Sequence, residues 1–249
     1  RDIAPWVKEM LDQGNSCFYQ VESDSMNYFD KEEKQYKSLP NQKAIIDLYV
    51  RKKANTIWKS DVASLIDLGD AVVNLEFHSK MNAVGGDTLQ AIQHAIDLTE
   101  DNYKGLVIAN QGQNFSVGAN LAMIFMMAIE QDYDELDFAV RAFQQTTQKI
   151  RYSNIPVVVA PHSMTLGGGC EIAMHADITQ AAAETYMGLV EMGVGLIPGG
   201  GGTKEMALRA SALFNQGDIQ NPLIRDLFLN VGMAKVSTSA HEAMDLGLL

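Results

Sequence analysis

Two glutamates lie in or beside glycine-rich, apolar segments and could act as acid–base groups. Glu171 directly follows Gly167-Gly168-Gly169-Cys170, and Glu191 lies in the largely apolar stretch from Met187 to Gly195. A carboxyl group in apolar surroundings loses solvation, which raises its pKa and prepares it to exchange protons near neutral pH. A lone glutamate among hydrophobic residues can equally be salt-bridged or edge-exposed, so both interpretations of Glu191 stay open.

Two short loops could present backbone N–H groups to an oxyanion. Residues 167–169 place three glycines between an expected strand and an expected helix, so a ligand can approach the backbone closely. The segment Phe115–Asn120, which contains Gly118, is a second strand-to-helix junction. Each loop is weak support for a site by itself, because glycines are also common in tight turns.

Several other motifs fail on inspection. Pro198 stands where a dinucleotide-binding fingerprint needs its third glycine. The phosphate-loop motif needs a glycine directly before its lysine, but Thr203 precedes Lys204. The Gly-x-Ser-x-Gly pattern of serine hydrolases is absent from the sequence. His162 and His175 are expected to be structural or exposed. The methionine-rich stretch Met123–Met127 is expected to fill the core and not to bind a cofactor.

The composition is that of a globular protein from a reducing compartment. Hydrophobic residues make up 47% of the chain, yet no apolar run reaches the roughly eighteen residues of a membrane span, so no membrane association is expected. The net charge of -12 would repel a nucleic-acid backbone, which argues against a nucleic-acid partner. Only Cys17 and Cys170 are present, without matched ligands, so neither a disulfide framework nor a metal site is expected. The expected location is cytoplasmic.

The elements that would hold the two loops alternate between strands and helices. A half-buried strand is predicted at residues 73–77, where apolar and polar side chains alternate in Val73, Asn74, Leu75, Glu76 and Phe77. Helical spacing over Leu89–Ile96 and the apolar run Leu106–Ala109 complete a strand–helix–strand unit. A further strand, Ile155–Ala160, runs towards the first glycine cluster, and a helix starts near Thr203 after the second. This alternation predicts an α/β fold class.

Three segments together resemble the crotonase superfamily in order and spacing. They are Phe115-Ser116-Val117-Gly118-Ala119-Asn120, Leu166-Gly167-Gly168-Gly169-Cys170-Glu171, and Glu191 followed by Gly195-Leu196-Ile197-Pro198-Gly199-Gly200-Gly201-Gly202-Thr203. The resemblance covers about Ala63 to Leu249 and implies a spiral of repeated ββα units in place of a simple doubly wound sheet. Asn120 departs from the aspartate often found there, which leaves the preceding N–H group untouched.

The resemblance also implies roles for single residues. The backbone N–H groups of Ala119 and Gly168 would form an oxyanion hole, and Glu171 and Glu191 would act on one water molecule. Other residues of the same segments would contact the substrate: Ser116, Gly118, Gly167, Gly169, Pro198 and Gly199. The phosphates of coenzyme A have four candidate partners, each of which could also be a solvated surface charge: Lys80, Lys104, Arg151 and Lys204.

The activity implied by the resemblance is that of an enoyl-CoA hydratase in fatty acid β-oxidation. The substrate would be a coenzyme A thioester, with no cofactor in this part of the protein. Water would attack C3 of a 2-enoyl-CoA to give a 3-hydroxyacyl-CoA, with Glu171 deprotonating the water and Glu191 protonating C2, although a coupled pair could share these roles. Two alternatives stay open: a 3-enoyl to 2-enoyl-CoA isomerase that uses Glu191, and a non-catalytic acyl-CoA-binding module.

Residues 1–62 are expected to form a small α+β appendage to a domain that spans residues 63–249. Trp6–Gly14 and Ser16–Tyr19 resemble the end of a 3-hydroxyacyl-CoA dehydrogenase domain, which implies a fused dehydrogenase that binds NAD and precedes this chain. The chain starts at Arg1 without a methionine or a signal peptide, and it ends before the C-terminal helices of the family. We therefore expect a piece of a longer protein that lacks those helices, and formation of a homo-oligomer stays open.

Overall fold

The chain forms two units, Arg1–Thr56 and Ile57–Leu249, and the structure, a computed structural model, describes residues 3–22, 25–40, 45–215 and 217–249. The second unit begins ahead of the boundary expected at Ala63, because strand β4 (Thr56–Lys59) joins its sheet. That the first unit is the end of a dehydrogenase domain stays a prediction.

In the described residues of the first unit, one helix precedes a three-stranded antiparallel sheet along the chain and a second helix follows it. The elements are α1 (Pro5–Asp12), β1 (Tyr19–Glu22), β2 (Ser25–Asp30), β3 (Gln35–Ser38) and α2 (Leu48–Asn55). Pro5 suits the first turn of α1, where its missing N–H would have no helical acceptor. Asp47 caps α2 by accepting a hydrogen bond from Tyr49 N–H at 2.9 Å.

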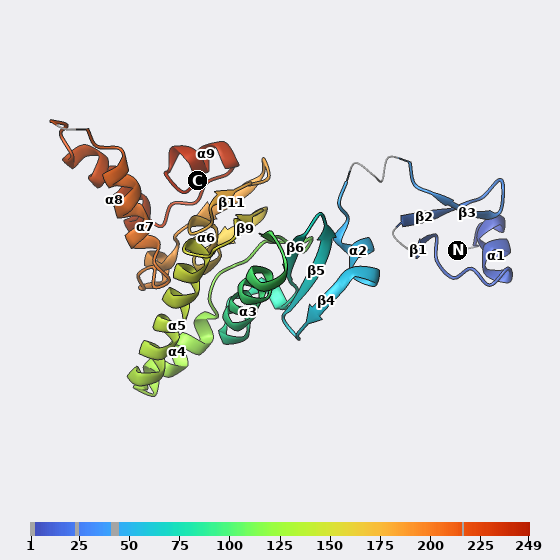
Figure 1. Cartoon of the computed structure of the whole chain (residues 1–249), viewed down its shortest axis with the longest axis horizontal. Helices are drawn as coiled ribbons and strands as arrows, with labels where there is room; N and C mark the ends of the chain where they lie inside the picture. Colours follow the sequence, from blue (N-terminus) through green and yellow to red (C-terminus); the bar gives the residue numbers. More distant parts are fainter. Residues whose placement is uncertain (1–2, 23–24, 41–44, 216) are drawn as a thin grey trace. The chain divides into compact units, whose positions relative to one another are not determined.

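The second unit is built on a six-stranded mixed sheet with the strand order β10-β8-β7-β6-β5-β4 (Figure 1). Besides β4, its strands are β5 (Ala63–Gly69), β6 (Val72–Phe77), β7 (Gly105–Ile108), β8 (Val157–Val159) and β10 (Ile178–Thr179). The hairpin β5–β6 is antiparallel, whereas β6, β7, β8 and β10 run parallel. Helix α3 (Gly86–Asn102) packs its apolar face on this sheet and completes a ββα unit with the hairpin.

Strand β6 is buried on both faces, which corrects the prediction of a half-buried strand. Asn74 and Glu76 are as inaccessible to solvent as the apolar residues between and beside them. Strands inside a parallel sheet are commonly covered on both sides, so a buried polar group there needs a partner. The Asn74 side-chain amide has one, because it donates a hydrogen bond to Ala109 O at 3.1 Å.

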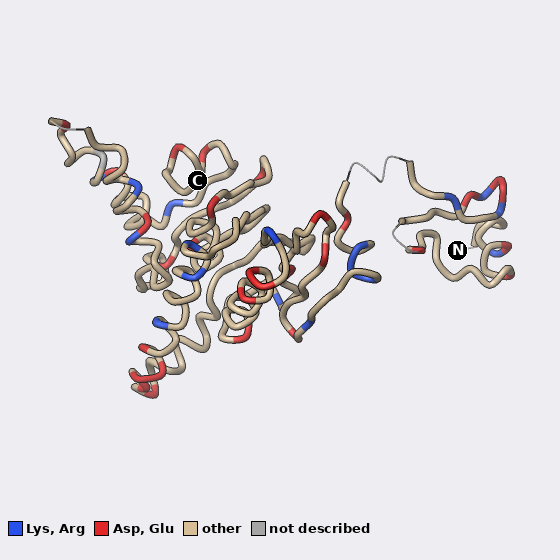
Figure 2. The backbone as a smooth tube through the Cα atoms, in the orientation of Figure 1, with Lys and Arg blue, Asp and Glu red and all other residues tan. Residues whose placement is uncertain are grey.

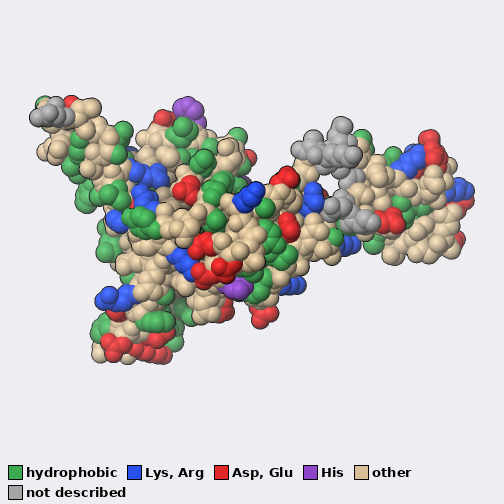
Figure 3. Space-filling view, viewed as in Figure 1, with side chains coloured by type: hydrophobic (Ala, Val, Ile, Leu, Met, Phe, Trp, Pro, Cys, Tyr) green, Lys and Arg blue, Asp and Glu red, His purple; other side chains and the backbone are tan. Residues whose placement is uncertain are grey.

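Helix α4 (Leu121–Ile129) lies at the surface, so the prediction that Met123–Met127 fills the core is wrong. None of its residues is buried, and the side chains of Met123 and Phe125 are 58% and 66% exposed. Figure 3, which has the same orientation as Figure 1, shows hydrophobic side chains on the surface in the region of α4. Figure 2 shows acidic residues gathered where α4 passes into α5 (Tyr133–Arg151). The apolar periodicity of α4 was therefore no guide to burial.

The remaining elements lead the chain through the glycine-rich segments. Two parallel strands, β9 (Ser163–Leu166) and β11 (Thr185–Gly188), pair outside the main sheet. Helix α6 (Gly168–Met174) follows β9 directly, and a short 3-10 helix (Glu191–Val194) follows β11. The chain then forms α7 (Gly202–Ala212), α8 (Asn221–Gly232) and α9 (Ala240–Asp245). Among the described residues, every helix is too short or too polar to span a lipid bilayer.

Candidate active site

The two predicted donor loops lie directly against each other. Ser116 forms an isolated parallel bridge with Thr165, and Leu166 N–H donates to Ser116 O at 3.0 Å. Gly118 has a φ of +86°, and a side chain there would place its Cβ 2.8 Å from Leu166 O and 3.1 Å from Gly168 N. Only glycine allows this approach, because the colliding atoms belong to backbone and cannot turn away.

Two backbone N–H groups of this junction have no hydrogen-bond acceptor among the described residues. Gly168 is the first residue of α6, where an N–H has no partner within the helix. Ala119 N–H donates no hydrogen bond to any other described residue. An ideal Cβ on Gly168 would lie 3.7 Å from Ala119 N, so the two groups are neighbours in space. Such a pair of free donors can bind one anionic oxygen.

Ser116 and Gly169 hold the junction together from behind. The Ser116 side chain is fully buried; its hydroxyl donates to Asn82 O at 2.7 Å and accepts from Gly118 N–H at 3.2 Å. A Cβ on Gly169 would lie 2.7 Å from Ser116 Cβ, so any larger residue would separate the two loops. These side-chain positions support the loops, and direct contact of Ser116 or Gly169 with a substrate stays a prediction.

Glu171 is buried in the first helical turn behind the donor loops. Its side chain accepts a hydrogen bond from Gly202 N–H at 2.8 Å on Oε1, and a Cβ on Gly200 would lie 2.6 Å from Oε2. Burial, and secondly the negative charge of Glu191, raise the pKa of the Glu171 carboxyl from its ordinary value of 4.5 to about 7. The N–H groups of Gly202 and Gly200 partly offset this rise. Glu171 is thus able to exchange protons near neutral pH.

Glu191 lies on the other side of the first glycine cluster, at the start of the 3-10 helix. Its Oε1 would be 3.1 Å from a Cβ on Gly167. Burial raises the pKa of the Glu191 carboxyl above 4.5. Its Oε2 is buried and has no hydrogen-bond partner among the described residues. A salt-bridged or edge-exposed Glu191, the other interpretation that the sequence allowed, is therefore not what the structure shows.

The second glycine cluster is oriented by α5. Gln144 Nε2 donates to Gly199 O at 3.0 Å, and Thr147 Oγ1 donates to Gly200 O at 2.7 Å. Because these carbonyl groups are held towards α5, the Gly202 N–H group is free to face Glu171. Pro198 is buried at the start of this loop and Gly199 is half-buried, so their contact with a substrate stays a prediction.

Phe143 forms an apolar wall beside both glycine clusters. A Cβ on Gly168 would lie 2.8 Å from its ring, and a Cβ on Gly200 would lie 2.9 Å from it. The ring therefore packs on the glycines of both clusters, next to Glu171 Oε2. Its helical spacing is the same as that of any core-facing side chain, so the local sequence does not show which segments it contacts.

Two of the four candidate phosphate contacts have acidic partners. Arg151 Nη1 lies 2.8 Å from Glu205 Oε2, and Lys204 Nζ lies 2.9 Å from Glu205 Oε1. Both cations are thus engaged with a buried carboxyl group of α7, which makes them weak candidates for phosphate binding. In the described part of the chain, no group of three or more His, Cys, Asp or Glu residues could hold a metal ion.

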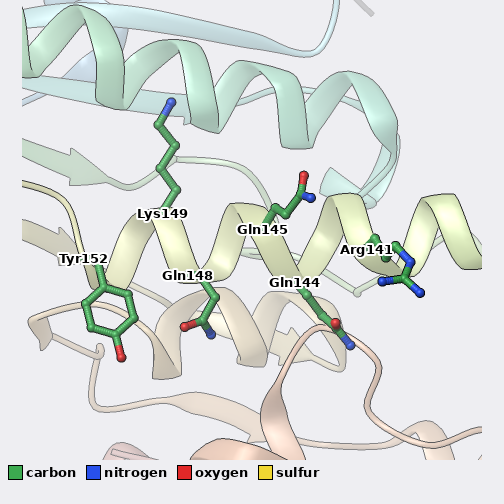
Figure 4. A pocket seen from close by; sticks show the side chains of 6 residues that line it. All are labelled: Arg141, Gln144, Gln145, Gln148, Lys149 and Tyr152. Carbon is green, nitrogen blue, oxygen red and sulfur yellow. The ribbon is translucent and has the colours of Figure 1, made fainter.

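A cavity of about 560 Å³ runs along α5, outside the glutamate site (Figure 4). It is lined by Arg141, Gln144, Gln145, Gln148, Lys149 and Tyr152. Figure 4 shows that the labelled side chains come from this helix, apart from Tyr152, which is its C-cap residue. Since the cavity is lined by neither glutamate nor either donor loop, it takes no part in the chemistry considered below.

The fold and the paired donor loops define a crotonase-fold protein. A solved enoyl-CoA hydratase from Polaromonas sp. JS666 superposes with a TM-score of 0.64 at 22% identity, covering 75% of this chain and 68% of that one. Residues 67–211 match the profile of the enoyl-CoA hydratase/isomerase family, so the chain belongs to that family. The predicted α/β fold and the crotonase resemblance are both confirmed.

Two curated relatives extend this comparison. A probable 3-hydroxyacyl-CoA dehydrogenase of Bacillus subtilis is 51% identical over all of this chain, which spans 31% of that protein. A crotonyl-CoA hydratase of Syntrophomonas wolfei is 33% identical over 55% of this chain and 52% of its own length. The chain therefore spans about a third to a half of the length of these relatives.

The raised pKa of Glu171 predicts a loss of stability as the pH rises. Because its folded pKa of about 7 exceeds the ordinary 4.5, its contribution is full below about pH 4.5 and disappears as the pH passes 7. The free energy of unfolding of the parent should therefore fall between pH 5 and 8 by about 3 kcal/mol more than that of Glu171→Gln. Urea unfolding at both pH values measures this difference, and parallel pH dependences would contradict the assignment.

Proposed function

We propose that this chain hydrates 2-enoyl-CoA thioesters to 3-hydroxyacyl-CoA thioesters. The observation that carries the proposal is the pairing of two carboxyl groups with raised pKa values, the buried Glu171 and the half-buried Glu191, beside two N–H donors without an acceptor among the described residues, Ala119 and Gly168. A relative that is named as a crotonyl-CoA hydratase supports it. Two acid–base groups suit a reaction that must both remove and add a proton.

The chemistry can be assigned to the groups of the site. Water forms a bond to C3 while Glu171 takes one of its protons, and the electrons of the double bond move into the thioester as an enolate. The Ala119 and Gly168 N–H groups bind the enolate oxygen, and such a donor is worth about 3–4 kcal/mol in related acyl chemistry. Glu191 then protonates C2, and the proton held by Glu171 restores Glu191 over the turnover. The two carboxyls titrate as a coupled pair, so either could carry part of the other's role.

The acyl chain would lie against the apolar wall of α5. Phe143 packs between Gly168 and Gly200, so its position would limit the room beside the reacting carbons. Gly118, Gly167, Pro198 and Gly199 would contact the thioester from the two glycine clusters. This arrangement also leaves open how long an acyl chain the site accepts, which the assay below measures directly.

A spectroscopic assay with short and long 2-enoyl-CoAs tests the proposal. We expect loss of the conjugated enoyl absorbance, and a kcat lower by about 10²-fold or more in Glu171→Ala, because one proton-transfer group is removed. An isomerase that uses Glu191 alone would instead convert 3-enoyl-CoA and keep most of its activity in Glu171→Ala. Binding of acyl-CoA without turnover of either substrate would favour the non-catalytic module.

The longer protein is a separate proposal. The Bacillus subtilis relative is much longer than this chain and is named as a probable 3-hydroxyacyl-CoA dehydrogenase, so we infer that a fused dehydrogenase domain with bound NAD precedes residues 1–62. Consecutive hydration and oxidation of an acyl-CoA would then take place in one protein of fatty acid β-oxidation, with a cytoplasmic location. Sequencing the gene upstream of Arg1 tests this, and a start codon immediately before it would refute the fusion.

A further inference from the structure

A buried charged cluster lies behind Glu171 and takes no part in the reaction described above. His175 is the C-cap residue of α6 and Glu205 lies in the first turn of α7, and their side chains are 0% and 1% exposed. Arg151 and Lys204 complete the cluster through the contacts with Glu205 given above. Buried ionisable groups are costly to maintain, so their place next to a proposed catalytic carboxyl calls for a physical explanation.

The imidazole of His175 satisfies the main chain of Glu171. Helix α6 ends at Met174, and His175 N–H donates to Ile172 O at 3.3 Å, so the backbone offers no regular helical donor to Glu171 O. His175 Nδ1 lies 2.7 Å from that carbonyl oxygen. A carbonyl can only accept, which places the ring proton on Nδ1. His175 therefore fixes the backbone of the residue whose side chain would do the chemistry.

The opposite edge of the same ring faces the start of α7. His175 Nε2 lies 3.4 Å from Glu205 Oε1. A Cβ on Gly201, where φ is +109°, would lie 3.0 Å from both Cε1 and Nε2, so the ring packs directly on the Gly201 backbone. The next residue, Gly202, donates its N–H to Glu171 Oε1 at 2.8 Å. The imidazole therefore lies between the main chain of Glu171 and the backbone of Gly201, next to the Gly202 N–H group that binds the Glu171 carboxylate.

We propose that His175 is a positioning residue for Glu171: it holds the Glu171 backbone at a fixed distance from the first turn of α7, so that the Gly202 N–H group stays on the carboxylate. The Gly201 backbone packs on the far side of the ring. Burial lowers the pKa of His175, which keeps the imidazole neutral with its proton on Nδ1. The inference rests on the proposed function insofar as Glu171 is taken to act on the water.

Two polar substitutions separate the roles of the two ring edges. In His175→Asn the amide nitrogen falls near the position of Nδ1 and can still donate to Glu171 O, whereas in His175→Gln it falls near Nε2 and can reach only Glu205. His175→Leu removes the hydrogen bond to Glu171 O and leaves an apolar side chain in place of the ring. His241, whose side chain is 87% exposed on α9, provides a matched control as His241→Asn.

We expect His175→Leu to lower kcat for 2-enoyl-CoA hydration by about 10- to 100-fold, the effect of a misplaced catalytic group, with KM changed less than about twofold. His175→Asn should recover most of kcat, whereas the kcat of His175→Gln should be as low as that of His175→Leu. The control His241→Asn should keep the kcat of the parent. Equal kcat values for His175→Asn and His175→Gln would overturn the proposal, and this comparison holds even if the leucine variant does not fold.

A readout without substrate separates this inference from the proposed function. The amide chemical shift of Gly202 should follow the Glu171 titration near pH 7 in the parent and in His175→Asn, and it should lose this response in His175→Gln. An inactive parent with that pattern would refute the hydratase and leave the positioning role intact. An active parent whose Gly202 titration and kcat are unchanged in every His175 variant would refute the positioning role alone.

Discussion

Replacing Glu191 by glutamine should lower kcat for 2-enoyl-CoA hydration by about 10²- to 10⁴-fold, the range for loss of a positioned acid–base group. The amide has nearly the same shape, so it should keep the packing against Gly167 while losing the proton that C2 requires. Glu171→Gln should cause a loss in the same range, because the water then has no base. Steady-state rates on a short 2-enoyl-CoA, with thermal unfolding to confirm the fold, measure both effects.

An exposed glutamate of the first unit provides the control for these variants. Glu32→Gln carries the same change in charge at a surface position, and it should keep the parent kcat. Full activity in Glu191→Gln would remove the assigned proton donor. Loss in Glu191→Gln together with full activity in Glu171→Gln would instead favour a reaction that needs only one carboxyl, as in the isomerase alternative.

Replacing Gly118 by alanine should reduce kcat by about 10²-fold or more, comparable to loss of an oxyanion donor. The new methyl group would meet Leu166 O at 2.8 Å and Gly168 N at 3.1 Å, so the two loops must separate and both donors move. The strained left-handed backbone should also cost about 1–2 kcal/mol of stability. Hydration kinetics and urea unfolding of the same preparation measure the two effects together.

Gly69 separates the collision from the backbone strain. Its φ is +91°, close to that of Gly118, but a Cβ there would meet no atom within 4 Å. Gly69→Ala should therefore lose a similar amount of stability from φ alone and keep its kcat. If Gly118→Ala and Gly69→Ala had the same kcat, the close contact of the two loops would be irrelevant to catalysis.

The fold was largely predictable because its signals are local. The strand–helix–strand unit predicted from residues 73–77, Leu89–Ile96 and Leu106–Ala109 corresponds to β6, α3 and β7. Periodicity did not predict exposure, however. Asn74 and Glu76 alternate with apolar residues as in a half-exposed strand, yet they are buried, because burial depends on what covers the sheet and not on the strand itself.

Helix α4 shows the same limit in the opposite direction. Its sequence from Met123 to Met127 is as apolar as a core helix, but α5 covers it only in part, and none of its side chains is buried. A sequence window reports the hydrophobicity of a segment. It does not report whether a second segment from elsewhere in the chain packs on it.

The sequence indicated the acidic residues and glycine loops of the candidate site, but not the side chains that hold them in position. Glu171 and Glu191 stood out because carboxyls are rare in glycine-rich, apolar surroundings, and the structure places them on either side of one glycine cluster. The contacts that Phe143 and His175 make with the glycine clusters and with Glu171 could not be predicted, because they join segments far apart in the chain. His175 in particular was expected to be structural or exposed, and the first of these descriptions holds, although its contacts lead directly to Glu171.

In both glycine clusters the packing leaves a backbone N–H group available at the candidate site. In the second cluster, side chains of α5 hold carbonyl oxygens, which leaves an N–H group directed at Glu171. In the first cluster, the start of α6 leaves the Gly168 N–H without an acceptor. The backbone donors of the proposed site therefore arise from packing that Cβ atoms would prevent.

The most direct test of the central claim is a crystal structure of the chain with a bound, unreactive acyl-CoA thioester. The account predicts the thioester oxygen at about 2.7–3.1 Å from both Ala119 N and Gly168 N, the distance range of an effective oxyanion hole. It also predicts that the Glu171 and Glu191 carboxyls both face the carbons next to the thioester. A thioester bound elsewhere, or carboxyls that face different cavities, would contradict it.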